Sequence, residues 1–176
     1  APYNNIYEDV EKFAFFSKAV LEALPYLDFC PDIIHCHDWQ TGLLPVFLRT
    51  LYGDEEYYTG IKTVFSIHNL KFQGRWKLPA VMDITGLPEQ IFASDKLESY
   101  GEANYLKGGV VYADAVTTVS PTYAYEITTY LIRQKLKNRT VSAIWSESGV
   151  DESSIVTLEF EETLASLMTT FAADTD

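Results

Sequence analysis

Residues 31–53, PDIIHCHDWQTGLLPVFLRTLYG, contain the pattern that decides the fold. The run DIIHCH is apolar on both of its faces, which is typical of a parallel strand buried on both sides. Pro45 lies in the apolar segment that follows, and proline is tolerated only near the start of a helix, so we expect the helix to begin at Thr41 or Gly42. The stretch therefore predicts a strand over 32–37 that leads directly into a helix.

The flanking sequence repeats this alternation of helices and strands. Apolar residues at intervals of three and four predict an amphipathic helix over 7–24. The further predicted elements are strands over 62–67 and 115–119, a helix over 104–112 and a helix that starts at Ser120-Pro121. This order predicts an α/β fold, a Rossmann-like doubly wound parallel sheet with right-handed crossovers, in which ligands bind at the carboxyl ends of the strands.

Composition excludes several classes of partner. The 176 residues carry a net charge of −12, and phosphate-rich partners require an excess of Lys and Arg, so we expect no nucleic acid and no membrane as a partner. Apolar residues make up 47% of the chain, enough to fill a core, yet no run approaches the ~20 residues that span a bilayer. The two cysteines show no metal-binding spacing. A globular, cytoplasmic protein is expected.

The three histidines of the chain follow or end two of the predicted strands. His35, His37 and His68 should therefore meet at one edge of the sheet. A polar ring is expected there, formed by His37, Asp38, Gln40, His68 and Asn69. Imidazole, amide and carboxylate groups donate to or accept from sugar hydroxyls, so this ring favours a hydroxyl-rich ligand.

Aromatic residues beside this ring have two interpretations. Trp39 and Phe72 are candidates to stack on a sugar face, although each also fits the core. Asp38 has an alternative role as the cap of the helix that follows. Lys107-Gly108-Gly109 lacks the spacing of a phosphate-binding loop and is typical of a helix that packs closely.

Two other functions remain open on these residues. His35 and His37 alternate on one strand and point to the same side, so together with His68 they form a candidate metal site of a metal-dependent hydrolase. A non-catalytic glucan-binding module is the other alternative. We expect no metal in the sugar-binding interpretation.

Five segments resemble, in order, the family of bacterial-type glycogen synthases and starch synthases. They are FAFFSKAVLEAL, PDIIHCHDWQTGLLPVFL, TVFSIHNLKFQGRW, ITGLPEQIF and SDKLESYGEANYLKGGVVYADAVTTVSPTYAYEI. The resemblance implies part of the N-terminal domain of a GT-B glycosyltransferase, which transfers glucose from ADP-glucose to the non-reducing end of an α-1,4-glucan with retention and without a cofactor.

The resemblance also implies roles for single residues. His37 is the implied catalytic residue, held against the donor glucose. The implied substrate-binding residues are Asp38, Trp39, Gln40, His68, Asn69, Gln73, Asn104 and Lys107.

The resemblance covers residues 8–128, so we expect a partial catalytic domain over 1–128. Residues 129–176 are expected to be a divergent tail, frameshifted or disordered, in which 161–171 could form a short helix. The family's Lys-x-Gly-Gly-Leu donor loop and its nucleotide-binding domain do not occur in this sequence. The chain by itself is therefore expected to be inactive.

Overall fold

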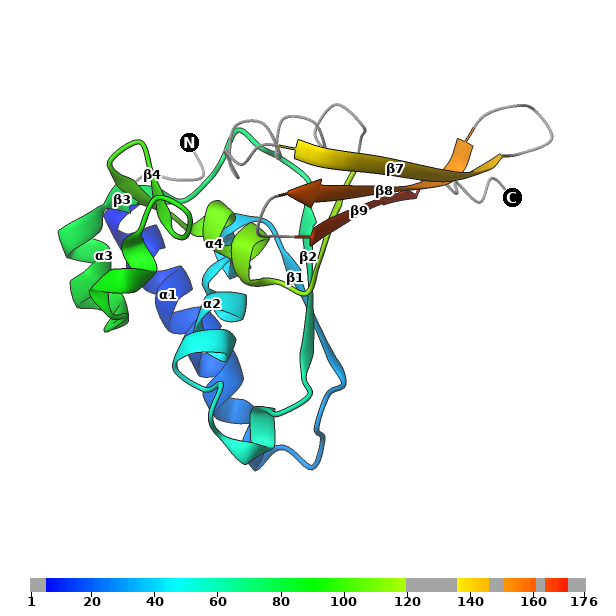
Figure 1. Cartoon of the computed structure of the whole chain (residues 1–176). Coiled ribbons are helices and arrows are strands. Elements are labelled where there is room, and N and C mark those ends of the chain that lie inside the picture. The colour runs from blue at the N-terminus through cyan, green and yellow to red at the C-terminus, as the bar shows by residue number, and fades with distance from the viewer. Residues whose placement is uncertain (1–5, 120–135, 146–150, 161–163, 171–176) are drawn as a thin grey trace.

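The computed structural model describes residues 6–119, 136–145, 151–160 and 164–170. Its main sheet has the strand order β1-β2-β6-β9-β8-β7 (Figure 1). Neighbouring strands are parallel from β1 to β9, and the pairs β9–β8 and β8–β7 are antiparallel. The strands span Ile33–His37 (β1), Lys62–Ile67 (β2), Ala115–Thr118 (β6), Leu136–Trp145 (β7), Asp151–Phe160 (β8) and Leu164–Thr170 (β9).

A small antiparallel sheet and four α-helices complete the described structure. The small sheet has the order β3-β5-β4, with β3 at Arg75–Lys77, β4 at Glu98–Ser99 and β5 at Glu102–Asn104. The helices are α1 (Ile6–Ala23), α2 (Leu43–Thr50), α3 (Leu78–Thr85) and α4 (Tyr105–Tyr112). Short 3₁₀ helices lie at Leu24–Tyr26 (η1), Trp39–Thr41 (η2), Glu56–Tyr58 (η3) and Glu89–Phe92 (η4). This arrangement confirms the predicted α/β class with a parallel sheet.

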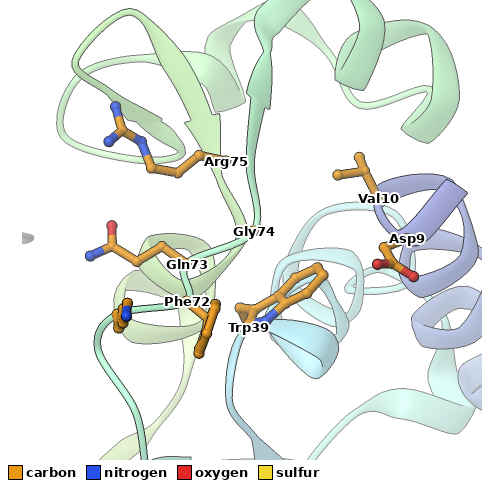
Figure 2. A pocket seen from close by; sticks show the side chains of 8 residues that line it. Asp9, Val10, Trp39, Phe72, Gln73, Gly74 and Arg75 are labelled. Atoms are coloured by element: carbon orange, nitrogen blue, oxygen red, sulfur yellow. The ribbon is translucent and has the colours of Figure 1, made fainter. Parts of the chain in front are cut away.

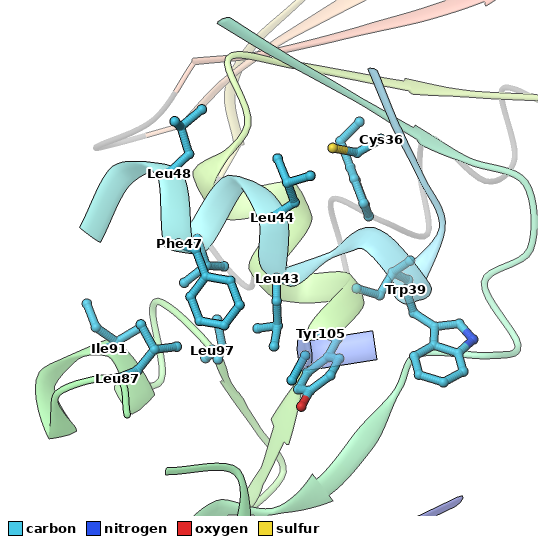
Figure 3. Packing of buried hydrophobic residues seen from close by; sticks show 14 of the residues in the cluster. Cys36, Trp39, Leu43, Leu44, Phe47, Leu48, Leu87, Ile91, Leu97 and Tyr105 are labelled. Carbon is cyan, nitrogen blue, oxygen red and sulfur yellow. The ribbon is translucent and has the colours of Figure 1, made fainter. Parts of the chain in front are cut away.

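The core lies between the sheet and the helices. Cys36 of β1, Phe65 of β2 and Val116 of β6 are buried on the face of the sheet that the helices cover. The α2 side chains Leu43, Phe47 and Leu48 pack there too, together with Leu97 and Tyr105 (Figure 3). Only the 3₁₀ turn η2 separates β1 from α2, so α2 packs on the sheet directly after the strand. This packing fixes the position of the end of β1.

Three glycines make the close packing of α4 possible. A Cβ on Gly42 would lie 2.1 Å from the carbonyl oxygen of Tyr105, and one on Gly109 would lie 2.4 Å from the ring of Phe65. Larger residues at these positions would push α4 away from α2 and from the sheet. The interpretation of Gly108-Gly109 as a close-packing site is confirmed, since a Cβ on Gly108 would lie 2.7 Å from the side chain of Leu97.

Most predicted elements agree with the structure within one or two residues. The helix predicted from Thr41 or Gly42 consists of the 3₁₀ turn η2 followed by α2, which begins at Leu43. The short helix expected over 161–171 was wrong, because residues 164–170 form strand β9 between β6 and β8. Periodicity over so few apolar residues does not separate a helix from a strand. The helix predicted at Ser120 lies outside the described residues.

One expectation about burial was also wrong for this chain. The sequence of β1 predicted burial on both faces, yet only Cys36 of that strand is buried, and Ile33 is 58% exposed. In the described part of the chain, the face of β1 that carries Ile33, His35 and His37 is open. The histidines therefore lie on an accessible face rather than inside a second layer.

Candidate functional site

The candidate site lies at the carboxyl edge of β1 and β2. β1 ends at His37, and His68 directly follows β2, so the parallel pairing brings the two imidazoles together. Nδ1 of His37 lies 3.1 Å from Nε2 of His68, and the ring centroids are 5.4 Å apart. One ring donates and the other accepts, which leaves a second nitrogen on each ring for a ligand.

His35 joins this pair from the open face of the sheet. Its ring centroid lies 4.2 Å from that of His37, and its Nε2 is 2.7 Å from Oγ of Ser66. Partial burial lowers the pKa of His35, and the neighbouring His37 and His68 rings lower it further, because the charged ring would lose part of its solvation and lie close to two other imidazoles. The predicted meeting of the three histidines is present in the structure.

Asp38 ties the two strand ends together. Its Oδ1 accepts hydrogen bonds from the backbone amides of His68 (2.8 Å) and Asn69 (3.2 Å), and its own amide donates to the carbonyl of Ser66 (2.9 Å). The alternative role of Asp38 as a helix cap is wrong, since η2 has no side-chain cap bond. Asp38 has φ 55° and ψ −177°, a conformation that costs a non-glycine residue about 1–3 kcal/mol and occurs most often at functional sites.

Thr41 is a supporting residue that the sequence interpretation missed. Its hydroxyl accepts from the amide of His37 at 2.7 Å and donates to the carbonyl of the same residue at 2.8 Å. This clamp holds the last residue of β1 against the first turn after it. A threonine four residues after a strand end is the available signal, because Ser and Thr hydroxyls often bond nearby backbone groups.

Gln73 and Asn104, both predicted site residues, do contact each other. Nδ2 of Asn104 donates to Oε1 of Gln73 at 2.7 Å, while Oδ1 of Asn104 accepts from the amide of Lys107 and so caps α4. Asn69 uses its side-chain oxygen to accept from the amide of Lys71. Gln40 lies in η2 and is half-buried. These polar groups shape the loop that runs from the end of β2 to β3.

Lys107 does not line this edge. Its side chain is 1% exposed, and its ammonium donates to the carbonyls of Ser94 and Glu98, the latter at 2.6 Å. The ammonium therefore points into the protein and holds the segment before β4. The family resemblance placed Lys107 among the substrate-binding residues, and the sequence pattern could assign the residue to a helix but not to a face of that helix.

A pocket of about 330 Å³ adjoins the edge (Figure 2). Trp39 and Phe72 lie close to each other in its wall, and Asp9 faces them from α1. Trp39 is only 6% exposed and packs edge-on against Phe13 at 5.0 Å, whereas Phe72 is 43% exposed. Phe72 is therefore the better placed of the two for stacking, and Trp39 is mainly a wall of the pocket.

Charged and amide groups surround the aromatic wall. Gln73 and Arg75 line the pocket along the same segment as Phe72. Arg75 bridges to Glu102 at 3.0 Å and lies 5.6 Å from the centroid of Tyr100, so its guanidinium is held in place. Asp9 and Arg75 were missed by sequence reasoning, because they lie on α1 and β3, far from the strand ends. An exposed ring with planar polar groups around it matches the chemistry of sugar binding.

The described residues do not support the metal-site alternative. Within them no group of three or more His, Cys, Asp or Glu side chains is placed to hold a metal ion. His37 and His68 instead hydrogen-bond to each other, and His35 bonds to Ser66. No helix in the described part of the chain is long and apolar enough to cross a membrane.

The fold and this edge define a mixed α/β domain of the GT-B glycosyltransferase class. Residues 1–140 match the model of the starch synthase catalytic domain, and the chain belongs to this family. Glycogen synthases from Lachnoclostridium phytofermentans and Lachnospira eligens are each 67% identical to it, over 72% and 73% of the chain. These matches cover 27% of each relative, so the chain spans about a quarter of their length.

A solved structure has the same fold. The catalytic domain of Starch Synthase IV from Arabidopsis thaliana, bound to ADP and acarbose, superposes with a TM-score of 0.61 at 35% identity. The match covers 68% of this chain and 25% of that one. Membership of this glycosyltransferase family disfavours the hydrolase alternative.

Proposed function

We propose that this chain supplies the sugar-facing part of the catalytic cleft of a glycogen or starch synthase. In this proposal the complete enzyme transfers glucose from ADP-glucose to the non-reducing end of an α-1,4-glucan with retention. The observation that carries the proposal is the His37–His68 pair, held by Asp38 at the carboxyl edge of the sheet beside an aromatic pocket. Family membership supports the same reaction.

His37 is the proposed catalytic residue, and His68 is its partner at the donor glucose. Glycosyl transfer passes through a transition state with positive charge on the sugar ring. A neutral imidazole that bonds a sugar hydroxyl orients the ring without repelling this charge. The His37–His68 hydrogen bond fixes both rings, because each can then turn only as the other allows.

The acceptor glucan is proposed to enter the pocket beside Phe72. The half-exposed ring offers a stacking surface, and Asp9, Gln73 and Arg75 offer groups for sugar hydroxyls. Trp39, Gln40, Asn69 and Asn104 are proposed to shape or contact the substrates. For Lys107 we propose an indirect role, since its ammonium holds Ser94 and Glu98.

The chain by itself is proposed to bind sugars weakly and to transfer none. It spans about a quarter of the length of its relatives, so most of the groups that would hold the departing diphosphate are proposed to belong to the rest of the enzyme. We place the complete enzyme in the cytoplasm, with no nucleic acid, membrane or metal in its reaction.

Titration of the isolated chain with maltotetraose and with ADP-glucose tests this function. We expect the resonances of His37, His68 and Phe72 to shift on addition of the sugars, and Phe72→Ala to weaken maltotetraose binding several-fold. Phe15→Ala is the matched control, because Phe15 is also exposed but lies on α1 outside this pocket. Equal effects of both substitutions would contradict the proposed pocket.

A transfer assay with radiolabelled ADP-glucose addresses the second part of the proposal. No label should enter the glucan when the chain is tested by itself. Steady incorporation, proportional to the concentration of the chain, would show that the fragment is a complete catalyst and that this part is wrong.

A further inference from the structure

A row of polar side chains crosses three neighbouring strands on the open face of the sheet. The register pairs His37 with Ser66 and Ser66 with Thr117. Oγ of Ser66 lies 2.5 Å from Oγ1 of Thr117 and 2.7 Å from Nε2 of His35. Two hydroxyls and an imidazole are therefore bonded in sequence from β6 to β1.

This row ends at the pair of imidazoles proposed to meet the sugar. The rings of His35 and His37 lie 4.2 Å apart with an angle of 35° between their planes, and His37 is bonded to His68. The contacts thus run without a break from Thr117 in the third strand to the edge of the site. A change in the orientation of the His35 ring would therefore alter its packing against the His37 ring.

We propose that His35 is a positioning residue, held by the Thr117–Ser66 hydroxyls as a neutral imidazole in one tautomer, and that its ring fixes the orientation and tautomer of His37. The role of His37 at the sugar rests on the proposed function. The positioning itself is a property of this chain without any ligand.

The bonding capacity of Ser66 limits the row to two directions. A hydroxyl has one proton to donate, and Ser66 has partners on both sides. In the proposed arrangement, Thr117 donates to Ser66 and Ser66 donates to Nε2 of His35, so His35 carries its proton on Nδ1. The reverse direction would place the proton of His35 on Nε2.

The surroundings favour a neutral His35. Partial burial lowers the pKa of His35. The neighbouring imidazoles of His37 and His68 lower it further. A neutral ring beside His37 keeps an additional positive charge away from the place where positive charge develops on the sugar. The row of hydroxyls is therefore proposed to control both the orientation of the His35 ring and its charge.

The test is nuclear magnetic resonance of the whole chain with ¹⁵N-labelled histidine, without sugar or nucleotide. In the unmodified chain, we expect His35 in a single neutral tautomer protonated on Nδ1. In Ser66→Ala, we expect a mixture of both tautomers at His35, a rise in the pKa of His35 because Nε2 loses a hydrogen bond that favours the neutral ring, and altered tautomer populations at His37. Ser66→Thr keeps the hydroxyl and should restore the original populations.

Thr118→Val is the matched control. Thr118 is the next residue of β6, on the opposite face, and its hydroxyl donates to the carbonyl of Ile67. This substitution should leave all three histidines unchanged. Thr117→Val breaks the row one step further away and replaces Ser66→Ala if that variant fails to fold.

Two results would overturn the proposal: protonation of His35 on Nε2 in the unmodified chain, or unchanged His37 populations in folded Ser66→Ala. Because no substrate is present, these results are separate from the sugar titrations. A chain that bound no sugar but showed the predicted tautomers would contradict the proposed function and support the positioning role.

Discussion

The carboxylate of Asp38 accepts a hydrogen bond from the backbone amide of His68 at 2.8 Å, across 30 residues of sequence. The same oxygen accepts from Asn69. The end of one strand therefore holds the loop that follows the next strand, and the separation of His37 and His68 depends on this contact. Asp38, for which the sequence offered a helix cap as an alternative role, instead connects two strand ends.

Asp38→Ala should lower the free energy of unfolding by about 2 kcal/mol, because two amides lose a charged acceptor. Asp38→Gly should be more stable than Asp38→Ala by about 1 kcal/mol, since glycine adopts a positive φ without strain. Urea denaturation gives both values. Equal stability of the two variants would show that the backbone strain at this position is negligible.

Asp114 predicts a pH dependence of stability. Burial opposes its ionisation, but the amide of Thr63 and the side chains of Arg49 and Lys62 lower its pKa from 3.8 to about 2. Its contribution to stability is therefore present above the unfolded-state pKa of 3.8 and is lost as the pH falls through about 2. This contribution is about 1–2 kcal/mol after allowance for solvent screening.

The comparison of the chain with Asp114→Asn measures this effect. Urea midpoints should differ at pH 6, and the difference should shrink between pH 4 and pH 2. A difference that is independent of pH in this range would mean that the carboxylate charge does not stabilise the fold.

Gly109→Ala should destabilise the chain by about 1–3 kcal/mol, because its Cβ would overlap the ring of Phe65. Phe65→Leu in the same chain should recover part of this loss by removing the obstructing ring. In Gly42→Ala the new Cβ would overlap the backbone of Tyr105 instead. No second substitution to a smaller side chain can relieve this overlap. Thermal unfolding of the three variants distinguishes overlap with a side chain from overlap with the backbone.

Lys107→Met tests whether Lys107 contacts the substrate, as the family resemblance implies, or only stabilises the fold through its buried hydrogen bonds. Loss of the ammonium leaves the carbonyls of Ser94 and Glu98 without this donor, which should cost about 1–3 kcal/mol of stability. Maltotetraose affinity of the folded fraction should remain within about twofold of the original, a difference of less than half a kcal/mol. A large loss of affinity with unchanged stability would favour direct contact with the sugar.

Local spacing in the sequence was sufficient for α1, β1, α2, β2, α4 and β6 and for the edge at which the histidines gather, but it did not predict α3 or the strands β3–β5 and β7–β9. Strand β2 coincides with the predicted residues 62–67, and helices α2 and α4 were found within two residues. The pattern of polar residues after β1 and β2 placed the histidines at one edge, because carboxyl ends of parallel strands meet there. The proposed tail boundary at residue 129 stays a prediction.

Other features depend on pairs of residues far apart in the chain. The contacts between Ser66 and Thr117 and between Asp38 and His68 join residues separated by 51 and 30 positions. Such pairs are set by strand register and by loops whose paths leave no local periodicity. The inward orientation of the Lys107 side chain and the strand over 164–170 also depend on distant residues. Burial among its neighbours orients Lys107, and pairing with β8 defines the strand.

The sequence by itself determined α1, β1, α2, β2, α4 and β6 in their order, the family resemblance and the edge at which polar groups gather, because these follow from spacings of two to four residues and from contiguous motifs. Only the tertiary structure decided that Asp38 holds the His68 loop, that Trp39 is a wall while Phe72 is exposed, and that His35 joins a hydroxyl row. The physical reason is that burial and hydrogen bonding depend on which distant residues occupy the neighbouring space.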